Sequence, residues 1–183
     1  MVTGNGPPFD AEEAEKQEIY MLIGQVILIS QIAEQALKAC MTFVIQDDDP
    51  LTLEKLKSQD QQEKRKTLGY FISKLRRKAE VDVDLDGLLS EYLEKRNLLV
   101  HNVEAIPEWN LKSQAGRRVA KQFIERLGYL ASETMMIFSG FLRAWQVESL
   151  PDVSMPLESE RLLQELDINY APLIRVLLSK KEV

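Results

Sequence analysis

Apolar residues recur at intervals of three and four along most of the chain, which is the pattern of amphipathic α-helices. The first such series predicts one long helix over residues 11–46. Asp10, followed by Glu13 three residues later, resembles a capping box and places the start of this helix at residue 11. The apolar positions of the series are Ile19, Leu22, Ile23, Val26, Ala33, Leu37, Cys40 and Val44.

Three more helical regions follow at the same spacing. The second runs from Leu53 through a polar middle to Leu75, and the third starts near Leu85 and ends between His101 and Pro107. The fourth, over 113–147, carries an apolar stripe typical of core. Its members are Val119, Phe123, Leu127, Leu130, Ile137, Phe141 and Trp145.

The connections between these helices are short. Residues 47–50, with the sequence DDDP, break the first helix and restart the chain. Residues 81–84 alternate like a strand but are too short to build a sheet, so we expect a loop that leads to an aspartate N-cap. Two prolines mark a linker at 150–156, and two short helical stretches follow at 158–166 and 172–181.

This organisation predicts an all-α protein, an antiparallel four-helix bundle with additional short C-terminal helices. We expect a flexible lead over residues 1–10 and the bundle over 11–147. A linker and a C-terminal helical extension would occupy 148–183.

Composition narrows the class of protein. The chain has 183 residues, of which 45% are hydrophobic and 28% charged, as in ordinary globular proteins. A single cysteine, Cys40, excludes an internal disulfide and a cysteine zinc site and indicates a reducing, cytoplasmic setting. The first ten residues lack the features of a signal peptide. The uncharged stretch 19–33 is shorter than a bilayer requires, so we expect a buried core helix and no membrane partner.

The formal net charge of −6 argues against non-specific binding of nucleic acid by the whole surface. One basic run without acidic residues lies at 64–78, where a solvated helix face is the usual explanation. A groove that leads RNA toward a catalytic site is the alternative. The basic residues are Lys64, Arg65, Lys66, Lys74, Arg76, Arg77 and Lys78.

A polar cluster in the third predicted helix is the candidate site. On a helical wheel, Arg96 lies in the middle of an apolar stripe made of Leu89, Tyr92, Leu93, Leu99 and Val100. A buried, unpaired guanidinium is costly, so Arg96 needs water, a carboxylate or a bound anion. Glu34, at the edge of the apolar face of the first helix, is the plausible carboxylate partner.

Asn97 and His101, the only histidine, are four residues apart and therefore neighbours on one helix face. Glu94 precedes Asn97 by three residues and belongs to the same polar stripe. For His101, the structural alternative is a hydrogen bond that completes the end of the helix.

The segment 94–102, with the sequence EKRNLLVHN, resembles the signature of the HEPN superfamily through Arg96, Asn97 and His101. This resemblance implies a homodimeric helical bundle and, in many members, a metal-independent endoribonuclease with the two motifs facing each other across the dimer. Arg96 and His101 of both subunits would then be catalytic, with Asn97 as an orienting residue. Glu34, Glu94 and Tyr92 would support them.

Such an enzyme would cleave RNA through its own 2′-hydroxyl and leave a 2′,3′-cyclic phosphate, without a cofactor or a metal ion. We therefore expect a homodimer with RNA as a partner, and a cognate regulatory protein is a further candidate partner. The alternative is a non-catalytic dimeric module that binds a nucleotide or a protein and has a regulatory role.

Overall fold

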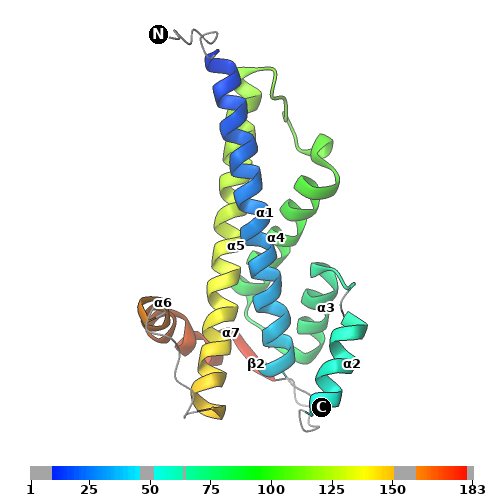
Figure 1. Ribbon diagram of the computed structural model, residues 1–183, viewed down its shortest axis with the longest axis vertical. Helices are drawn as coiled ribbons and strands as arrows, with labels where there is room; N and C mark the ends of the chain where they lie inside the picture. Colours follow the sequence, from blue (N-terminus) through cyan, green and yellow to red (C-terminus); the bar gives the residue numbers. More distant parts are fainter. Residues whose placement is uncertain (1–9, 46–51, 64, 151–159, 181–183) are drawn as a thin grey trace, which may run out of the picture.

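The computed structural model is an elongated helical molecule in which two long helices lie side by side over its length (Figure 1). These helices are α1 (Ala11–Phe43) and α5 (Gln114–Ser149), and the shorter helices pack beside them. The protein is therefore an all-α helical bundle, as the sequence predicts. The structure describes residues 10–45, 52–63, 65–150 and 160–180.

Side-chain caps begin both long helices. The Asp10 carboxylate accepts a hydrogen bond from the backbone N–H of Glu12 at 3.2 Å, which confirms Asp10 as the N-cap of α1. The Ser113 hydroxyl accepts one from the N–H of Gly116 at 3.1 Å and starts α5. These caps satisfy N–H groups that the first turn of a helix leaves without partners.

The two long helices run parallel to each other. Glu15 pairs with Arg117 at 2.5 Å, Glu18 with Lys121 at 2.7 Å, and the Phe43 ring lies 5.1 Å from that of Trp145. The residue number rises on both helices in step through these three contacts. α1 and α5 therefore point in the same direction, as the colours of Figure 1 also show.

This direction differs from that expected for the first and last of four antiparallel helices. The second helical region consists of two helices, α2 (Leu53–Glu63) and α3 (Leu68–Lys78), between which the chain turns back (Figure 1). The extra reversal makes α5 parallel to α1. The described part of residues 46–52, where the sequence predicts a break, is Thr52 alone.

Helix α4 (Val83–His101) carries the predicted site and runs antiparallel to α3 and α5. Arg76 of α3 pairs with Asp86 at 2.6 Å, and Arg126 of α5 hydrogen-bonds Glu91 at 2.9 Å. α4 begins two residues before the predicted start near Leu85, and an aspartate caps it as expected, since the Asp82 carboxylate accepts the N–H groups of the second and third helical residues. A 3₁₀ turn, η1 (Val103–Ala105), follows α4 and leads the chain back toward α5.

Residues 79–81 form a strand, which overlaps at Val81 the segment 81–84 that was expected to be a loop. This strand, β1 (Ala79–Val81), pairs antiparallel with β2 (Leu178–Lys180), and Glu80 lies opposite Ser179. The expectation of a loop was wrong because the hydrogen-bonding partner comes from the other end of the chain. Local alternation over three residues carries no information about such a distant partner.

The C-terminal extension packs onto α5. Its elements are α6 (Glu160–Glu165), the π-helical turn η3 (Leu166–Tyr170), the 3₁₀ turn η4 (Ala171–Leu173) and α7 (Ile174–Leu177). Arg143 of α5 hydrogen-bonds Asp167 at 2.8 Å, and Tyr170 lies against Gly140, where a β-carbon would collide with it. The predicted helix over 172–181 is shorter than expected, because its end forms β2. Of the predicted linker, Leu150 alone is described.

The core lies where the apolar faces of α1, α3, α4 and α5 meet. Leu37, Phe71, Leu89 and Phe138 are among its fully buried side chains. Cys40 also lies in this core, and burial raises the pKa of its thiol well above the usual range. The thiol therefore behaves as a small apolar group rather than a nucleophile.

One face of α1 stays outside this core. By length and composition, α1 is the single helix of the described chain that is apolar enough to cross a membrane. In its most apolar stretch, 22% of the residues are buried within the protein. The expectation of a buried core helix therefore holds for the face that packs on α5 and not for the opposite face.

Replacing Gly116 with alanine is expected to destabilise the protein by about 1–3 kcal/mol or more. A β-carbon at this position would lie 2.1 Å from the backbone carbonyl oxygen of Asn110, so the loop before α5 would have to move. Gly87→Ala is the matched control, since a β-carbon there meets no atom within 4 Å. It should stabilise by about 0.5–1 kcal/mol through helix propensity. Urea unfolding measures both, and equal effects would contradict this account.

Candidate functional site

The Arg96 side chain contacts two other residues of the predicted site, Glu34 of α1 and His101 at the end of α4. Its Nη2 lies 2.9 Å from Oε1 of Glu34, so the expected ion pair is present. Its Nη1 lies 3.3 Å from Nε2 of His101. The side chains of Arg96 and Glu34 are 21% and 16% exposed, respectively. One edge of the guanidinium is therefore held by a sheltered carboxylate while the other faces the histidine.

His101 is the last residue of α4 and its side chain is exposed. A guanidinium can only donate hydrogen bonds, so Nε2 of His101 accepts in this arrangement and the ring proton lies on Nδ1. Asn97 is also exposed, and its Oδ1 lies 3.4 Å from Nη1 of Arg96. The structure thus brings together the three residues of the motif on the exposed side of one helix end.

Tyr92 has a structural position rather than a reactive one. Its ring is buried, and its hydroxyl donates a hydrogen bond to the backbone carbonyl of Ser30 at 3.1 Å. Burial raises the pKa of Tyr92 to about 12, and the nearby Glu34 carboxylate acts in the same direction. Tyr92 therefore fixes α4 on α1 one turn before Arg96.

A groove opens beside Arg96 between α1, α4 and α5. Its volume is about 240 Å³, with Glu34 and Arg96 as its charged residues. Ser30 contributes a buried hydroxyl oxygen that has no hydrogen-bond partner among the described residues. The remaining lining residues are Val26, Ile27, Gln31, Leu99, Val100 and Leu127.

Glu94 lies outside this network. Its side chain is exposed, and no hydrogen bond or ion pair joins it to Arg96, Asn97 or His101 in the described structure. The structure thus gives Glu94 the environment of a solvated helix charge.

The basic run does not form a continuous unpaired track. Lys74 pairs with Glu63 at 2.5 Å, Arg76 pairs with Asp86, and the Lys66 ammonium lies over the ring of Tyr70. Arg65 and Arg77 are exposed, Lys78 is half-buried, and Lys64 lies outside the described residues. Because α3 and α4 are antiparallel, the start of α3 with Arg65 and Lys66 lies toward the Arg96 end of α4. The residues that remain open to RNA are therefore few.

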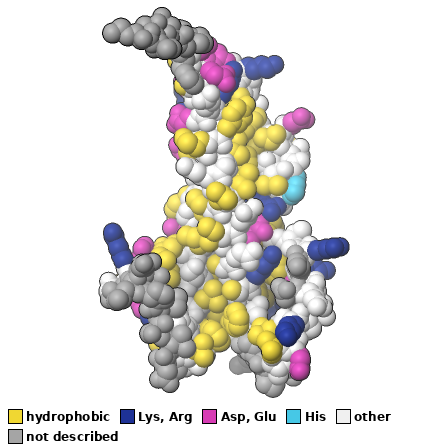
Figure 2. Space-filling model, viewed as in Figure 1, with side chains coloured by type: hydrophobic (Ala, Val, Ile, Leu, Met, Phe, Trp, Pro, Cys, Tyr) yellow, Lys and Arg dark blue, Asp and Glu magenta, His cyan; other side chains and the backbone are white. Residues whose placement is uncertain are grey.

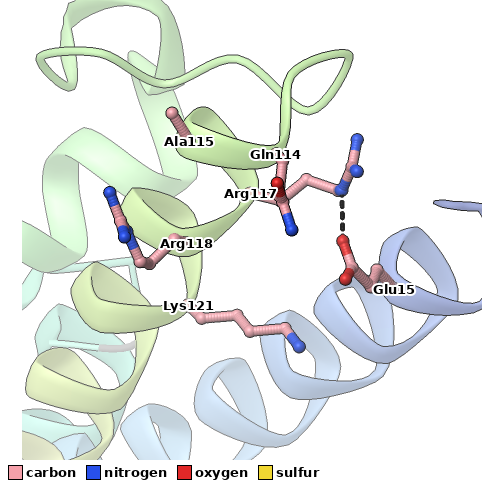
Figure 3. A pocket seen from close by; sticks show the side chains of 6 residues that line it. All are labelled: Glu15, Gln114, Ala115, Arg117, Arg118 and Lys121. Carbon is pink, nitrogen blue, oxygen red and sulfur yellow. Dashed lines mark hydrogen bonds and ion pairs between the residues drawn. The ribbon is translucent and has the colours of Figure 1, made fainter.

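A second hollow, of about 390 Å³, lies where α5 begins beside α1 (Figure 3). Arg117 is buried there and donates to Glu15, while Lys121 reaches toward α1 and pairs with Glu18. Arg118 points away from Glu15 in Figure 3. The sequence alone did not reveal the partners of Arg117 and Lys121 on α1. These two pairs offset part of the positive charge of this hollow and join the two long helices.

The described residues do not form a cluster of side chains that could bind a metal ion. No group of three or more histidine, cysteine, aspartate or glutamate side chains within the described ranges could hold a metal ion.

Neither models of protein families, nor curated proteins, nor solved structures give a significant match to this chain. The chemical interpretation therefore rests on the site's own residues.

Those residues supply two of the functions that phosphodiester cleavage requires. His101 offers an imidazole whose Nε2 lone pair faces Arg96 in this arrangement, so the ring acts as a general base when Nε2 turns from the guanidinium to the substrate hydroxyl. Arg96 offers a fixed cation directly beside it, suited to a phosphate oxygen. One subunit provides one histidine, so a reaction that needs both a general base and a general acid requires a second group.

Proposed function

We propose that this protein is a metal-independent endoribonuclease that acts as a homodimer, with Arg96, Asn97 and His101 of both subunits forming the catalytic site. The observation that carries the proposal is the position of the Arg96 guanidinium. Glu34 holds it 3.3 Å from the chain's single histidine, beside an open groove. This contact supports the resemblance of the motif to the HEPN signature.

The reaction is a transphosphorylation within RNA. One His101 accepts the proton of a ribose 2′-hydroxyl, and the 2′-oxygen attacks the adjacent phosphorus. The bond between phosphorus and the 5′-oxygen breaks, and the protonated His101 of the other subunit gives its proton to that oxygen. The products are a 2′,3′-cyclic phosphate and a 5′-hydroxyl end, and no water or oxidant is consumed.

Arg96 and Asn97 act on the phosphate and the imidazole. Negative charge grows on the non-bridging oxygens as the 2′-oxygen attacks, and a cation fixed at that place lowers the barrier. Glu34 keeps the guanidinium in position, so little reorganisation is needed when the phosphate arrives. The Asn97 amide orients either the His101 ring or a phosphate oxygen.

The direct test is cleavage of mixed single-stranded RNA by the purified protein, with and without EDTA. We expect cleavage that persists in EDTA and yields 2′,3′-cyclic phosphate ends, detected by mass spectrometry. RNA with 2′-O-methyl ribose should stay intact, because the attacking hydroxyl is missing. Cleavage that requires a divalent metal, or that proceeds on the methylated RNA, would overturn the mechanism.

The alternative function is a non-catalytic dimeric module that binds a nucleotide or a protein. The groove of about 240 Å³ supports it, since most of its lining is apolar and suits a ligand rather than a reaction. A protein that binds RNA oligonucleotides or mononucleotides tightly and leaves RNA intact in the cleavage assay would favour this function over the enzyme.

A further inference from the structure

A stripe of large apolar side chains on α1 has no partner within the described protein. Tyr20, Met21, Leu28 and Ile32 are each more than half exposed. Figure 2 shows the hydrophobic band along the molecule, with the histidine at its edge. Apolar side chains on a soluble protein usually occur singly, and a contiguous row of them marks a contact surface.

These residues share one helix face. At 100° per residue, Tyr20, Gly24 and Leu28 fall within about 40° of a single line, with Met21 and Ile32 on one flank. No charged residue occurs between residues 19 and 33. The face is therefore uncharged over about four helical turns and largely apolar, with Gln31 as an exposed polar residue within it.

Gly24 lies at the centre of this stripe, and no contact within the subunit requires a glycine at this position. A β-carbon there would meet no atom within 4 Å, and the position is exposed. Glycine lowers the stability of a helix interior by about 1 kcal/mol relative to alanine. A small residue in the middle of an apolar helix face allows a second helix to approach closely.

We infer that the α1 stripe, made of Tyr20, Met21, Gly24, Leu28 and Ile32, is the surface on which a second copy of this chain packs. The two α1 helices cross at Gly24 in opposite directions about a two-fold axis. Tyr20 of each copy then packs against Leu28 of the other. This inference rests on the proposed function for the identity of the occupant, because the proposed reaction needs a second His101.

The neighbourhood of the stripe favours a second copy. Ile27 borders the stripe and Gln31 lies within it, and both also line the groove that contains Arg96, so the stripe and the site are continuous. A copy seated on the stripe would bring its own α4 end toward this groove. In a two-fold contact, the same patch serves both subunits and must match itself, which an uncharged apolar row satisfies.

Charge gives a weak preference for the direction of the crossing. Glu12 and Glu13 lie in the first turn of α1, where Lys16 and Arg117 offset part of their charge, so two α1 helices aligned in the same direction would bring a small excess of acidic charge together. An opposite crossing at Gly24 keeps the two acidic ends apart. The first turn also lacks basic residues that would attract an anionic membrane surface.

The first experiment measures the oligomeric state by analytical ultracentrifugation. Leu28→Glu should raise the dissociation constant of the dimer about tenfold or more, because it buries a charge at the centre of the contact. Ile168→Glu is the matched control, since Ile168 is equally apolar and exposed but lies on the C-terminal extension. It should sediment like the wild type. Circular dichroism establishes that both variants stay folded.

The second experiment detects the contact by crosslinking, so it does not depend on weakening the dimer. Gly24→Cys places a thiol at the proposed crossing point, and the natural Cys40 is buried and does not compete. Oxidation by copper phenanthroline should yield a disulfide-linked dimer, with two thiols losing two electrons to the oxidant. Gly87→Cys puts a thiol at an equally open helical glycine on α4 and should stay monomeric on denaturing gels.

The outcomes separate this inference from the proposed function. A wild type that is dimeric and cleaves RNA, with Leu28→Glu still dimeric and Gly24→Cys not crosslinked, would overturn the α1 contact and leave the enzyme standing. A dimer that crosslinks at Gly24 but leaves RNA intact would support the contact and remove the enzyme. A monomeric wild type, or one that floats with phosphatidylcholine vesicles through this face, would overturn the inference.

Discussion

Replacing His101 with alanine is expected to lower the rate of RNA cleavage about 10²- to 10⁴-fold, the range typical of a lost general acid–base group. His101 is the only histidine of the chain, so no neighbouring imidazole can replace it. Its side chain is exposed at the end of α4, and its removal should leave the thermal midpoint nearly unchanged. Single-turnover cleavage of a labelled RNA measures the loss.

Glu104→Ala is the control for His101→Ala, because Glu104 is exposed on the turn that follows α4 and lies outside the motif. It should cleave RNA at the wild-type rate. If His101→Ala retains full cleavage while its fold is intact, the imidazole has no part in the reaction. The contact with Arg96 would then complete the helix end, as in the structural alternative.

Arg96→Leu is expected to reduce cleavage about 10²- to 10³-fold, since it removes the cation that would stabilise the charged phosphate. Unlike the histidine variant, it should also lower stability. Glu34 would keep a sheltered carboxylate without its guanidinium partner, and an unpaired charge in such a position is destabilising. Thermal unfolding and single-turnover cleavage, measured on the same samples, give both effects.

A second substitution separates these two effects. In Arg96→Leu combined with Glu34→Leu, both charges are replaced by apolar side chains, which often restores or exceeds the original stability. We expect the thermal midpoint to recover and cleavage to stay low. Recovery of cleavage together with stability would show that Arg96 serves only to hold the fold.

Much of the fold could be read from the sequence because it depends on local patterns. Helical spacing of apolar residues predicts α1, α4 and α5 nearly to their observed ends. The cap at Asp10 was predicted because a carboxylate before a helix can accept hydrogen bonds from its first N–H groups, and an aspartate cap was also expected within 81–84, where Asp82 has this role. The contact of Arg96 with His101 joins residues five apart, which is outside the three- and four-residue spacings that place side chains on one helix face, so the spacing of the motif did not predict it.

Other features required contacts between distant segments. The strand at 79–81 needed β2, about a hundred residues later, and the parallel direction of α5 followed from a reversal between α2 and α3. Glu34 could be suggested as the partner of Arg96, but the 2.9 Å contact depends on how α4 packs on α1. The partners of Lys74 and Arg76 likewise come from other helices, so the basic run could not be judged from its composition.

By itself, the sequence determined the helices, their caps and the polar motif at the end of α4, because these arise from interactions within a few residues. The tertiary structure alone decided which sides of those helices are covered. Residues 19–33 are uncharged and mostly apolar on every side, and only the packing of α5 and α4 against α1 shows that Tyr20, Met21 and Leu28 stay exposed. Burial depends on the elements that meet in space, and a pattern along one helix does not contain them.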